Sequence, residues 1–352
     1  MFETTWSGEV EQVTDGDERV RLFKEVLALE GEVPLGVVRK RRLDGPQGPP
    51  LLLVHGFAQN RYSWHTSKRS MSAWLAERGY DVWNLELRGH GRSRDAGQQG
   101  AERFEDYVRD VGLVSAAMPA PAFWIGHSLG GAALYAAAIR ALGPERQGTP
   151  PRGVVGIAAL YQFGQANPVL GALARATHAM RDLPIMGRLQ VRTRMAGQLI
   201  SKLYGLSDVT GYAVPLSGWW PGSIEPELLE ERLREGFDWT SITVWQEMSR
   251  WAAEGRCDFD EAWSHTDVPL LVMLGDRDHL LPPADGRVAY DRSGSSDRTL
   301  LLFDDWHHEV HWGHLDLILG RYARKHVWQA LHQWLYERSG MLPTGKARTA
   351  GP

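Results

Sequence analysis

Six short apolar runs, each followed by a turn, constrain the fold of this chain most. Their hydrophobicity is continuous rather than alternating, which is typical of strands covered on both faces of a parallel sheet. Helical patterns lie between them, and this strand–helix order predicts an α/β architecture with a mostly parallel central sheet flanked by helices. The runs cover residues 51–56, 81–87, 122–128, 153–160, 269–276 and 299–305, and the helical patterns cover 62–78, 104–117, 129–142 and 322–338.

The rest of the chain divides around this pattern. The first 45 residues alternate like paired strands, with "RVRLFKEVLALEG" and "VPLGVVRKRRL" flanking a turn. Between residues 161 and 266 the patterns look helical and contain no strand-like run, so we predict a helical cap, because structureless loops of this length are rare. The predicted division is a core over 1–160 and 267–339, a cap over 161–266 and a disordered tail over 340–352.

Composition narrows the class of protein further. A chain of 352 residues with 43% hydrophobic residues can build one large domain with an insertion, or two modest domains. The net charge is only -4 and no lysine or arginine stripe stands out, so no nucleic-acid partner is expected. Neither a signal peptide nor a membrane span is visible, which predicts a cytoplasmic protein. The single cysteine, Cys257, excludes an intrachain disulfide and is expected to be a buried, inert thiol.

The stretch "IGHSLGG" (125–131) carries the strongest local signal for chemistry. It matches the G-x-S-x-G nucleophile elbow, with an apolar run before it and the helical pattern "AALYAAAIRAL" after it. Such a sharp strand-to-helix turn strains the backbone of the serine and places it at a helix N-terminus, where the dipole favours negative charge. Side chains at Gly126 and Gly130 would collide in this turn. Ser128 is therefore the predicted nucleophile.

A serine nucleophile also needs N–H donors for the oxyanion that forms on the attacked carbonyl. The stretch "VHGFAQN" (54–60) ends an apolar run, so we predict that the backbone N–H groups of Phe57 and Leu129 form the oxyanion hole. His55 in this stretch is expected to brace the loop. His90 lies in a Gly-His-Gly turn ahead of the serine, which is the wrong chain order for the base.

The acid that orients the base should follow the serine and precede the histidine. "LVMLGDRDHLLPP" offers Asp276 and Asp278 directly after an apolar run. Asp278 is preferred, because a turn that opens at Gly275 lets the later carboxylate point back over the sheet edge; Asp276 is the alternative. Asp304 and Asp305 lie close to the histidine cluster and are expected to be solvent or turn residues.

The stretch "HHEVHWGHLD" (307–316) holds four of the thirteen histidines. Its "HEVH" does not match H-E-x-x-H, and no other dense His/Cys/Asp group completes a site, so no metal is expected. His314 is the predicted base, because Gly313 lets the loop approach the serine and the apolar "LDLILG" anchors it. His311 is the alternative base. The other members of the cluster, His307 and His308, are expected to be surface or loop residues.

Fifteen tryptophans are many for this length, and several fall in the second half of the predicted cap. We expect most of them to pack the cap onto the sheet and some to line an apolar substrate pocket. They are Trp219, Trp220, Trp239, Trp245, Trp251 and Trp263.

Together these motifs resemble those of the α/β-hydrolases and, within that superfamily, of the acid lipases of the gastric and lysosomal type. The resemblance is carried by "HGFAQNRYSWH", "GYDVWNLELRG", "GHSLGG", "VWQEMSRWAAEG", "GDRDHLLPPADGRV" and "WGHLDLILG". It implies an α/β-hydrolase fold with Ser128 as nucleophile, Asp278 as acid and His314 as base. It also implies oxyanion donors at Phe57 and Leu129, although Leu129 stands where that family usually has glutamine.

The motifs predict a serine hydrolase that cleaves carboxylic esters with an apolar acyl or alcohol group through an acyl-enzyme, without a metal or organic cofactor. Two alternatives remain open. One is an acyltransferase, in which an alcohol or thiol replaces water in the second step. The other is a catalytically silent protein whose cap pocket holds a lipid-like ligand. Epoxide and haloalkane hydrolysis are disfavoured, because those hydrolases need aspartate at the elbow.

Overall fold

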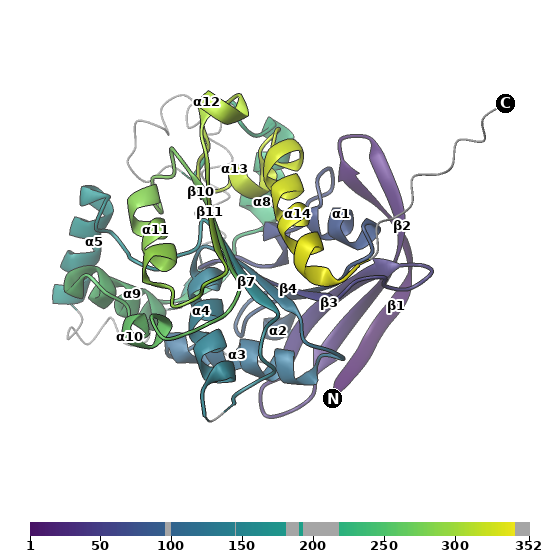
Figure 1. Ribbon diagram of the computed structural model, residues 1–352, viewed down its shortest axis with the longest axis horizontal. Coiled ribbons are helices and arrows are strands. Elements are labelled where there is room, and N and C mark those ends of the chain that lie inside the picture. Colours follow the sequence, from purple (N-terminus) through teal and green to yellow (C-terminus); the bar gives the residue numbers. More distant parts are fainter. Residues whose placement is uncertain (96–99, 145, 181–189, 193–217, 342–352) are drawn as a thin grey trace.

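One sheet runs through the middle of the protein (Figure 1). The computed structural model describes residues 1–95, 100–144, 146–180, 190–192 and 218–341. Within these ranges the sheet has nine strands in the order β1-β2-β3-β5-β4-β6-β7-β10-β11. They are β1 (Phe2–Asp15), β2 (Glu18–Leu29), β3 (Leu35–Arg42), β4 (Pro50–Val54), β5 (Asp81–Leu85), β6 (Phe123–His127), β7 (Gly153–Ile157), β10 (Leu270–Gly275) and β11 (Arg298–Phe303).

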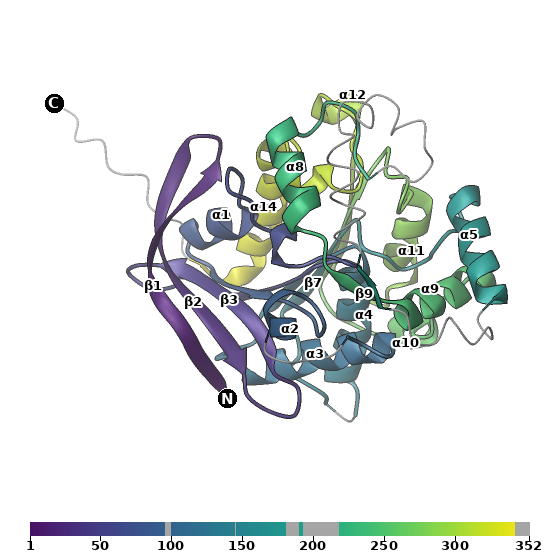
Figure 2. The ribbon, with the colours of Figure 1, turned by 180° about the vertical axis from the view of Figure 1, so that it is seen from behind.

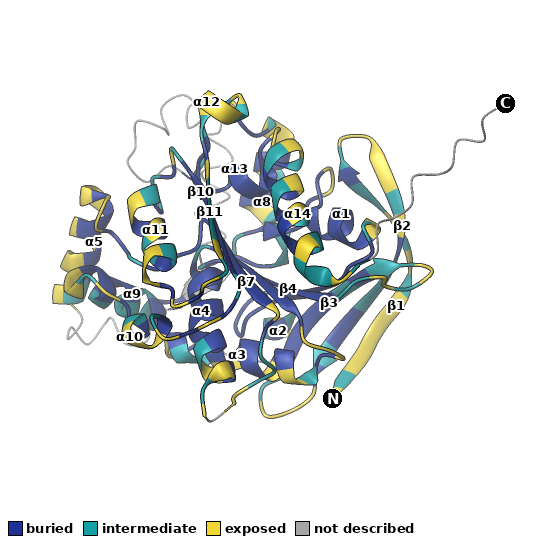
Figure 3. Cartoon of the chain, viewed as in Figure 1, coloured by how far each residue is buried: buried dark blue, intermediate teal, exposed yellow. Residues whose placement is uncertain are grey.

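The six strands from β5 to β11 are mutually parallel, and each overlaps one of the six apolar runs. Every residue of β4, β5, β6, β7 and β10 is buried, and these strands are dark in Figure 3. Burial on both faces explains why their hydrophobicity is continuous. The prediction of a mostly parallel sheet is confirmed. Because parallel strands end at one edge, the segments that follow β4, β6, β10 and β11 meet there.

The first three strands form the antiparallel part of the sheet. β1 pairs with β2, β2 with β3, and β3 with β5, all antiparallel. They curve away from the parallel strands at the end of the molecule that holds the N-terminus (Figure 1). This confirms the paired strands predicted from alternation in the first 45 residues.

Helices cover both faces of the parallel strands. α1 and α14 lie on one face and α3 and α4 on the other, in the front view and from behind (Figures 1 and 2). The helical patterns over 104–117 and 129–142 coincide with α3 and α4. The core helices are η1 (Arg61–Ser63), α1 (Met71–Glu77), α2 (Gly91–Asp95), α3 (Phe104–Ala117), α4 (Leu129–Leu142), α11 (Pro283–Arg292), α12 (Asp305–His308), α13 (Asp316–Leu319), the π-helix η3 (Arg324–Trp328) and α14 (Gln329–Ser339).

The helix predicted over 62–78 was too long. It is divided into the single turn η1 and the helix α1, because the Ser70 hydroxyl caps a new helix by accepting a hydrogen bond from the Ala73 N–H. A serine in this role starts a helix rather than continuing one.

The segment over 161–266 is mostly helical where the structure describes it, but it is not free of strands. β8 (Gln190–Arg192) and β9 (Trp239–Ser241) pair antiparallel, which corrects the prediction of no strand here. Three residues are too few for an alternating pattern to show in the sequence. The helices are α5 (Pro168–Ala179), α8 (Pro226–Glu235), α9 (Ile242–Glu254) and α10 (Asp260–Trp263).

Two further predictions concern the ends of the described ranges and the membrane. Of the tail predicted over 340–352, only Gly340 and Met341 fall within the described residues. Across the described ranges, no helix combines the length and apolar character that a membrane crossing needs.

Candidate active site

Ser128 occupies the sharp turn between β6 and α4. Its backbone has φ 56° and ψ -128°, a left-handed conformation that a residue with a side chain rarely adopts. The turn is held by hydrogen bonds from the Ser128 N–H to the Ile157 carbonyl (3.2 Å) and from the Leu160 N–H to the Ser128 carbonyl (2.9 Å). The backbone therefore fixes where the hydroxyl of Ser128 stands.

The glycines around the serine are required by close backbone contacts. A Cβ on Gly126 would lie 2.6 Å from the Gly131 Cα, and a Cβ on Gly130 would lie 2.3 Å from the His55 carbonyl oxygen. A Cβ on Gly56 would lie 2.8 Å from the Ser128 Cβ. The collisions expected at 126 and 130 are thus confirmed, and the loop after β4 lies directly against the serine.

Two backbone N–H groups lie beside Ser128. Leu129 is the first residue of α4, where N–H groups have no partner inside the helix. Phe57 follows Gly56, and within the described ranges its N–H donates to no protein acceptor. Both residues are those that the sequence predicts as oxyanion donors.

Asp278 and His314 form a buried pair. The His314 Nδ1 lies 2.7 Å from the Asp278 Oδ2, and the side chains are 3% and 1% exposed, respectively. The other carboxylate oxygen, Oδ1, accepts from the N–H groups of Leu280 (2.9 Å) and Leu281 (2.7 Å). The carboxylate is therefore fully engaged, and its contact with Nδ1 leaves the Nε2 of His314 as the free ring nitrogen.

Ser128 and His314 line one cavity of about 350 Å³. No hydrogen bond joins the Ser128 hydroxyl to the His314 ring in the described structure; such bonds are often long without substrate and tighten when it binds. The remainder of the wall is almost wholly apolar. It comprises Phe57, Ala58, Gln59, Leu160, Phe163, Leu170, Gly218, Trp219, Leu233, Phe237, Trp245, Met248, Leu280, Leu281 and Leu315.

The tryptophans of the 161–266 segment divide as expected. Trp219 and Trp245 line the cavity, whereas Trp251 and Trp263 are fully buried packing residues. Trp220 packs edge-on against His311. The side chain of Trp239 lies outside the described residues.

His127 connects the elbow to the histidine loop, a role that was not predicted from the sequence. Its Nε2 lies 3.1 Å from the carbonyl oxygen of His314, and the two rings are 4.5 Å apart. Burial, followed by the neighbouring His314, holds the pKa of His127 well below its usual value. A neutral ring that donates to this carbonyl fixes the backbone of His314. The only signal in the sequence was that a histidine occupies the variable position directly before the serine of G-x-S-x-G.

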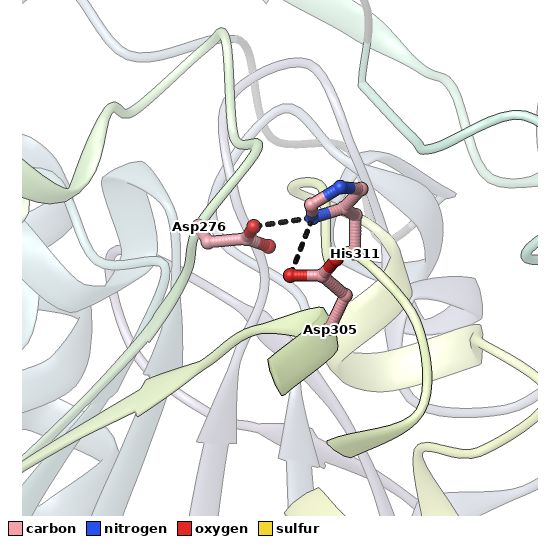
Figure 4. A group of neighbouring side chains, drawn as sticks. All are labelled: Asp276, Asp305 and His311. Atoms are coloured by element: carbon pink, nitrogen blue, oxygen red, sulfur yellow. Dashed lines mark hydrogen bonds and ion pairs between the residues drawn. The ribbon is translucent and has the colours of Figure 1, made fainter. Parts of the chain in front are cut away.

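Asp276 and His311, the alternatives for acid and base, pair with each other (Figure 4). The His311 Nδ1 lies 2.6 Å from Asp276 and 3.4 Å from Asp305. Neither Asp276 nor His311 lines the cavity with Ser128. Asp305, expected to be a solvent or turn residue, has an exposed side chain as predicted, and as the first residue of α12 it also lies near this pair.

The same group bears on metal binding. The sequence predicts no further cluster of ligands, whereas Asp276, Asp305 and His311 have donor atoms within 4.8 Å of one another. Carboxylate and imidazole donors suit several divalent cations. The same three groups also satisfy one another without an ion, because the His311 Nδ1 lies at hydrogen-bond distance from Asp276 and 3.4 Å from Asp305.

Two further histidines, His307 and His55, and the cysteine are placed as the sequence predicts. The His307 ring is 67% exposed, and Asp304 caps α12 by accepting from the His307 N–H (2.8 Å). His55 braces its loop as predicted, since its Nε2 accepts from the Leu87 N–H (3.1 Å). Burial raises the pKa of the Cys257 thiol to about 12, in agreement with an inert thiol.

Asp316 anchors the histidine loop to the segment over 161–266. It is 1% exposed, and its carboxylate accepts from the Ser223 hydroxyl (2.6 Å), the Trp220 N–H (2.8 Å) and the Gly313 N–H. Burial raises the pKa of Asp316 to about 7, although these hydrogen bonds act in the opposite direction. No pattern in the sequence pointed to this residue.

Comparisons with known proteins agree with this architecture. Residues 49–156 match the family model of the alpha/beta hydrolase fold. The chain is 26% identical over 265 residues to a monoacylglycerol lipase of Mycolicibacterium smegmatis, covering 74% of this chain and 81% of that protein. It is 39% identical over 85 residues to epoxide hydrolase B of Mycobacterium tuberculosis, covering 24% of this chain and 23% of that protein.

A solved structure extends the likeness to most of the chain. The monoacylglycerol lipase of Paleococcus ferrophilus superposes with a TM-score of 0.61 at 18% identity, covering 87% of this chain and 99% of that chain. With the sheet order and the elbow, these matches identify the fold as the α/β-hydrolase fold.

Proposed function

We propose that the protein is a serine hydrolase that cleaves carboxylic esters with an apolar acyl or alcohol group. The observation that carries the proposal is the convergence of Ser128 and the buried Asp278–His314 pair on one apolar cavity. The similarity to a monoacylglycerol lipase over 74% of the chain supports the same class of reaction.

In the first step the Ser128 Oγ attacks the ester carbonyl carbon, and the His314 Nε2 takes the hydroxyl proton. Asp278 holds the imidazole in the tautomer with Nδ1–H and stabilises the imidazolium that forms. The N–H groups of Phe57 and Leu129 bind the oxyanion. When the tetrahedral intermediate collapses, the alcohol leaves with the proton from His314, and Ser128 carries the acyl group.

In the second step water attacks the acyl group on Ser128. His314 takes a proton from this water, the bond to Oγ breaks, and the proton returns to Oγ as the carboxylic acid leaves. No metal or organic cofactor takes part in the proposed steps.

The wall of the cavity supports an apolar substrate. Phe163, Trp219 and Trp245 contribute large apolar surfaces, and ligand pockets of this composition bind mainly by apolar burial. The resemblance of the acid loop and the histidine loop to those of the acid lipases is in line with an apolar ester as the substrate. Ser128 stands where an epoxide hydrolase needs aspartate, so the short match to such an enzyme does not favour epoxide opening.

Burst kinetics with a p-nitrophenyl ester test the proposal. We expect one equivalent of p-nitrophenol per wild-type chain to be released rapidly, and no burst from Ser128→Ala, because the acyl-enzyme cannot form without the hydroxyl. Ser70→Ala is the matched control, since Ser70 caps α1 and does not line the cavity. Equally slow release from wild type and Ser128→Ala would refute the hydrolase and favour the silent lipid-binding alternative.

A further inference from the structure

A second, smaller cavity of about 90 Å³ lies over the face of strands β2, β3 and β5, and none of its lining residues lines the cavity with Ser128. Four of its lining side chains are cationic: Lys24, Lys40, Arg61 and Arg92. Such a concentration of positive charge around so small a space needs an explanation.

Lys24 and Lys40 are opposite each other in the antiparallel register of β2 and β3. Like charges directly across a strand pair destabilise a sheet. Lys40 is only 2% exposed, and its Nζ donates to the Ser72 hydroxyl (2.9 Å). Within the described residues it makes no ion pair with a carboxylate. Burial, followed by the charges of Lys24 and Arg61, lowers the pKa of Lys40 well below its usual value.

One carboxylate, that of Glu86, offsets part of this charge. It accepts from the Arg61 Nη1 (3.2 Å) and from the backbone N–H of Arg92 (3.0 Å). The Nε of Arg92 is buried and has no acceptor among the described residues. Glu25, the neighbour of Lys24 on β2, pairs with Arg39 instead. Four basic side chains around the cavity are therefore accompanied by one carboxylate, and among the described residues the Arg92 Nε and the Lys40 Nζ have no anionic partner.

We propose that this cavity binds a small multivalent oxyanion, of the size and charge of inorganic phosphate. A tetrahedral oxyanion presents acceptors in several directions at once, and charge-assisted hydrogen bonds to lysine and arginine are among the strongest in proteins. Pockets for drug-sized ligands take roughly 300–1,000 Å³, so a cavity of about 90 Å³ favours a small ion over a nucleotide or a lipid headgroup with its glycerol.

The anion would also explain the lysine pair. An unpaired buried charge is costly, whereas a charge that is paired and hydrogen-bonded is tolerated. A dianion between Lys24 and Lys40 converts their repulsion into two attractive contacts. Ser72, which accepts from the Lys40 Nζ, is linked to Ser70 (Oγ to Oγ 3.2 Å), and Ser70 is linked to His65 (Oγ to Nδ1 3.0 Å). This chain of hydrogen bonds holds the Lys40 amino group in place.

Calorimetric titration with sodium phosphate, with ionic strength held constant by sodium chloride, tests the site. We expect saturable binding of one phosphate per chain, weakened at least ~10-fold in Lys40→Met and in Lys24→Met, because each removes a charge-assisted contact. Arg41→Met is the matched control, since Arg41 follows Lys40 on β3 but its guanidinium lies over Phe23, outside the cavity. Without phosphate, Lys40→Met should melt no lower than wild type.

No phosphate-specific heat in wild type, or affinity unchanged in both lysine variants, would overturn the proposal. Glycerol 3-phosphate that binds as tightly as free phosphate would overturn the size limit and with it the assignment to a free ion. Ser128→Ala should bind phosphate as wild type does, so this site stands or falls independently of the proposed hydrolase.

Discussion

Two aspartate–histidine pairs join the same two loops, and they differ in what they face. Asp278–His314 (2.7 Å) has side chains 1% and 3% exposed, and His314 lines the cavity with Ser128. Asp276–His311 (2.6 Å) has side chains 16% and 19% exposed and faces Asp305 instead. The two distances are nearly equal. The hydrogen bond alone therefore does not distinguish the proposed base; its burial and its place on the cavity with Ser128 do.

The outer pair has a structural task that follows from its contacts. Asp276 accepts from the Trp312 N–H (2.8 Å), and the Arg277 N–H donates to the Trp312 carbonyl (2.9 Å). These bonds hold the histidine loop against the loop after β10, two residues before His314. The outer pair therefore supports the position of the inner one.

Replacing the histidine of each pair by alanine should give the largest difference in activity between the two pairs. His314→Ala is expected to lower kcat/KM for a p-nitrophenyl ester by ~10⁴-fold or more, because in the proposed mechanism His314 takes the proton from Ser128. His311→Ala should stay within about 10-fold of wild type, since it loses loop support only. Both variants need a melting curve that shows they are folded. An inactive His311→Ala beside an active His314→Ala would reverse the assignment.

Neutralising the two carboxylates should give the next largest difference. Asp278→Asn is expected to lower kcat by ~10³–10⁴-fold, because the amide favours the wrong tautomer of His314. Asp276→Asn should cost less than about 10-fold, since an amide can still bond to the Trp312 N–H. The ratio of the two kcat values is the measurement. A ratio near one would mean that the buried pair does not orient the base.

Asp316 adds a third buried carboxylate to the comparison of the two pairs. It is as buried as Asp278, but its hydrogen-bond donors are a hydroxyl and backbone N–H groups rather than a histidine. Its pKa of about 7 lies above the value of ~3.9 in an unfolded chain, so the folded state holds the proton more tightly. The unfolded state ionises first as pH rises, and this carboxyl therefore lowers stability progressively between about pH 4 and pH 7. Relative to Asp316→Asn, wild type should lose melting temperature across this window. A constant difference would contradict the raised pKa.

The smallest effects are expected at the exposed end of the cluster. His307→Ala and His308→Ala should each keep kcat/KM within about 2-fold of wild type, since neither lines the cavity. Steady-state rates at several ester concentrations measure this. A large loss of kcat/KM in His307→Ala would show that the position of His314 depends on α12.

Sequence patterns predicted the elements whose burial is continuous and the motif whose turn is strained. The six core strands and the helices α3 and α4 were recognisable, because the strands leave continuous apolar runs and a long helix leaves a 3.6-residue period in the sequence. β8 and β9 were not, since three residues carry no period. The outer Asp276–His311 pair was missed as a pair, although both residues were weighed separately.

Other features depend on the fold rather than on local pattern. The Lys24–Lys40 contact is set by the register of β2 and β3, which no local property of either strand specifies. His127 and Asp316 act through backbone groups brought close by the loops after β6 and β11. Such bonds follow only once the sheet order is known.

The cavity takes its proposed reactive groups from outside residues 161–266 and part of its apolar wall from within them. Ser128, Asp278 and His314 lie outside residues 161–266, whereas Phe163, Trp219, Leu233, Phe237, Trp245 and Met248 lie within them. Substitutions in this wall can change the shape that a ligand must have without touching the groups that would react with it. A chain built in this way is modular, so descendants can diverge in ligand range while the reactive groups stay the same.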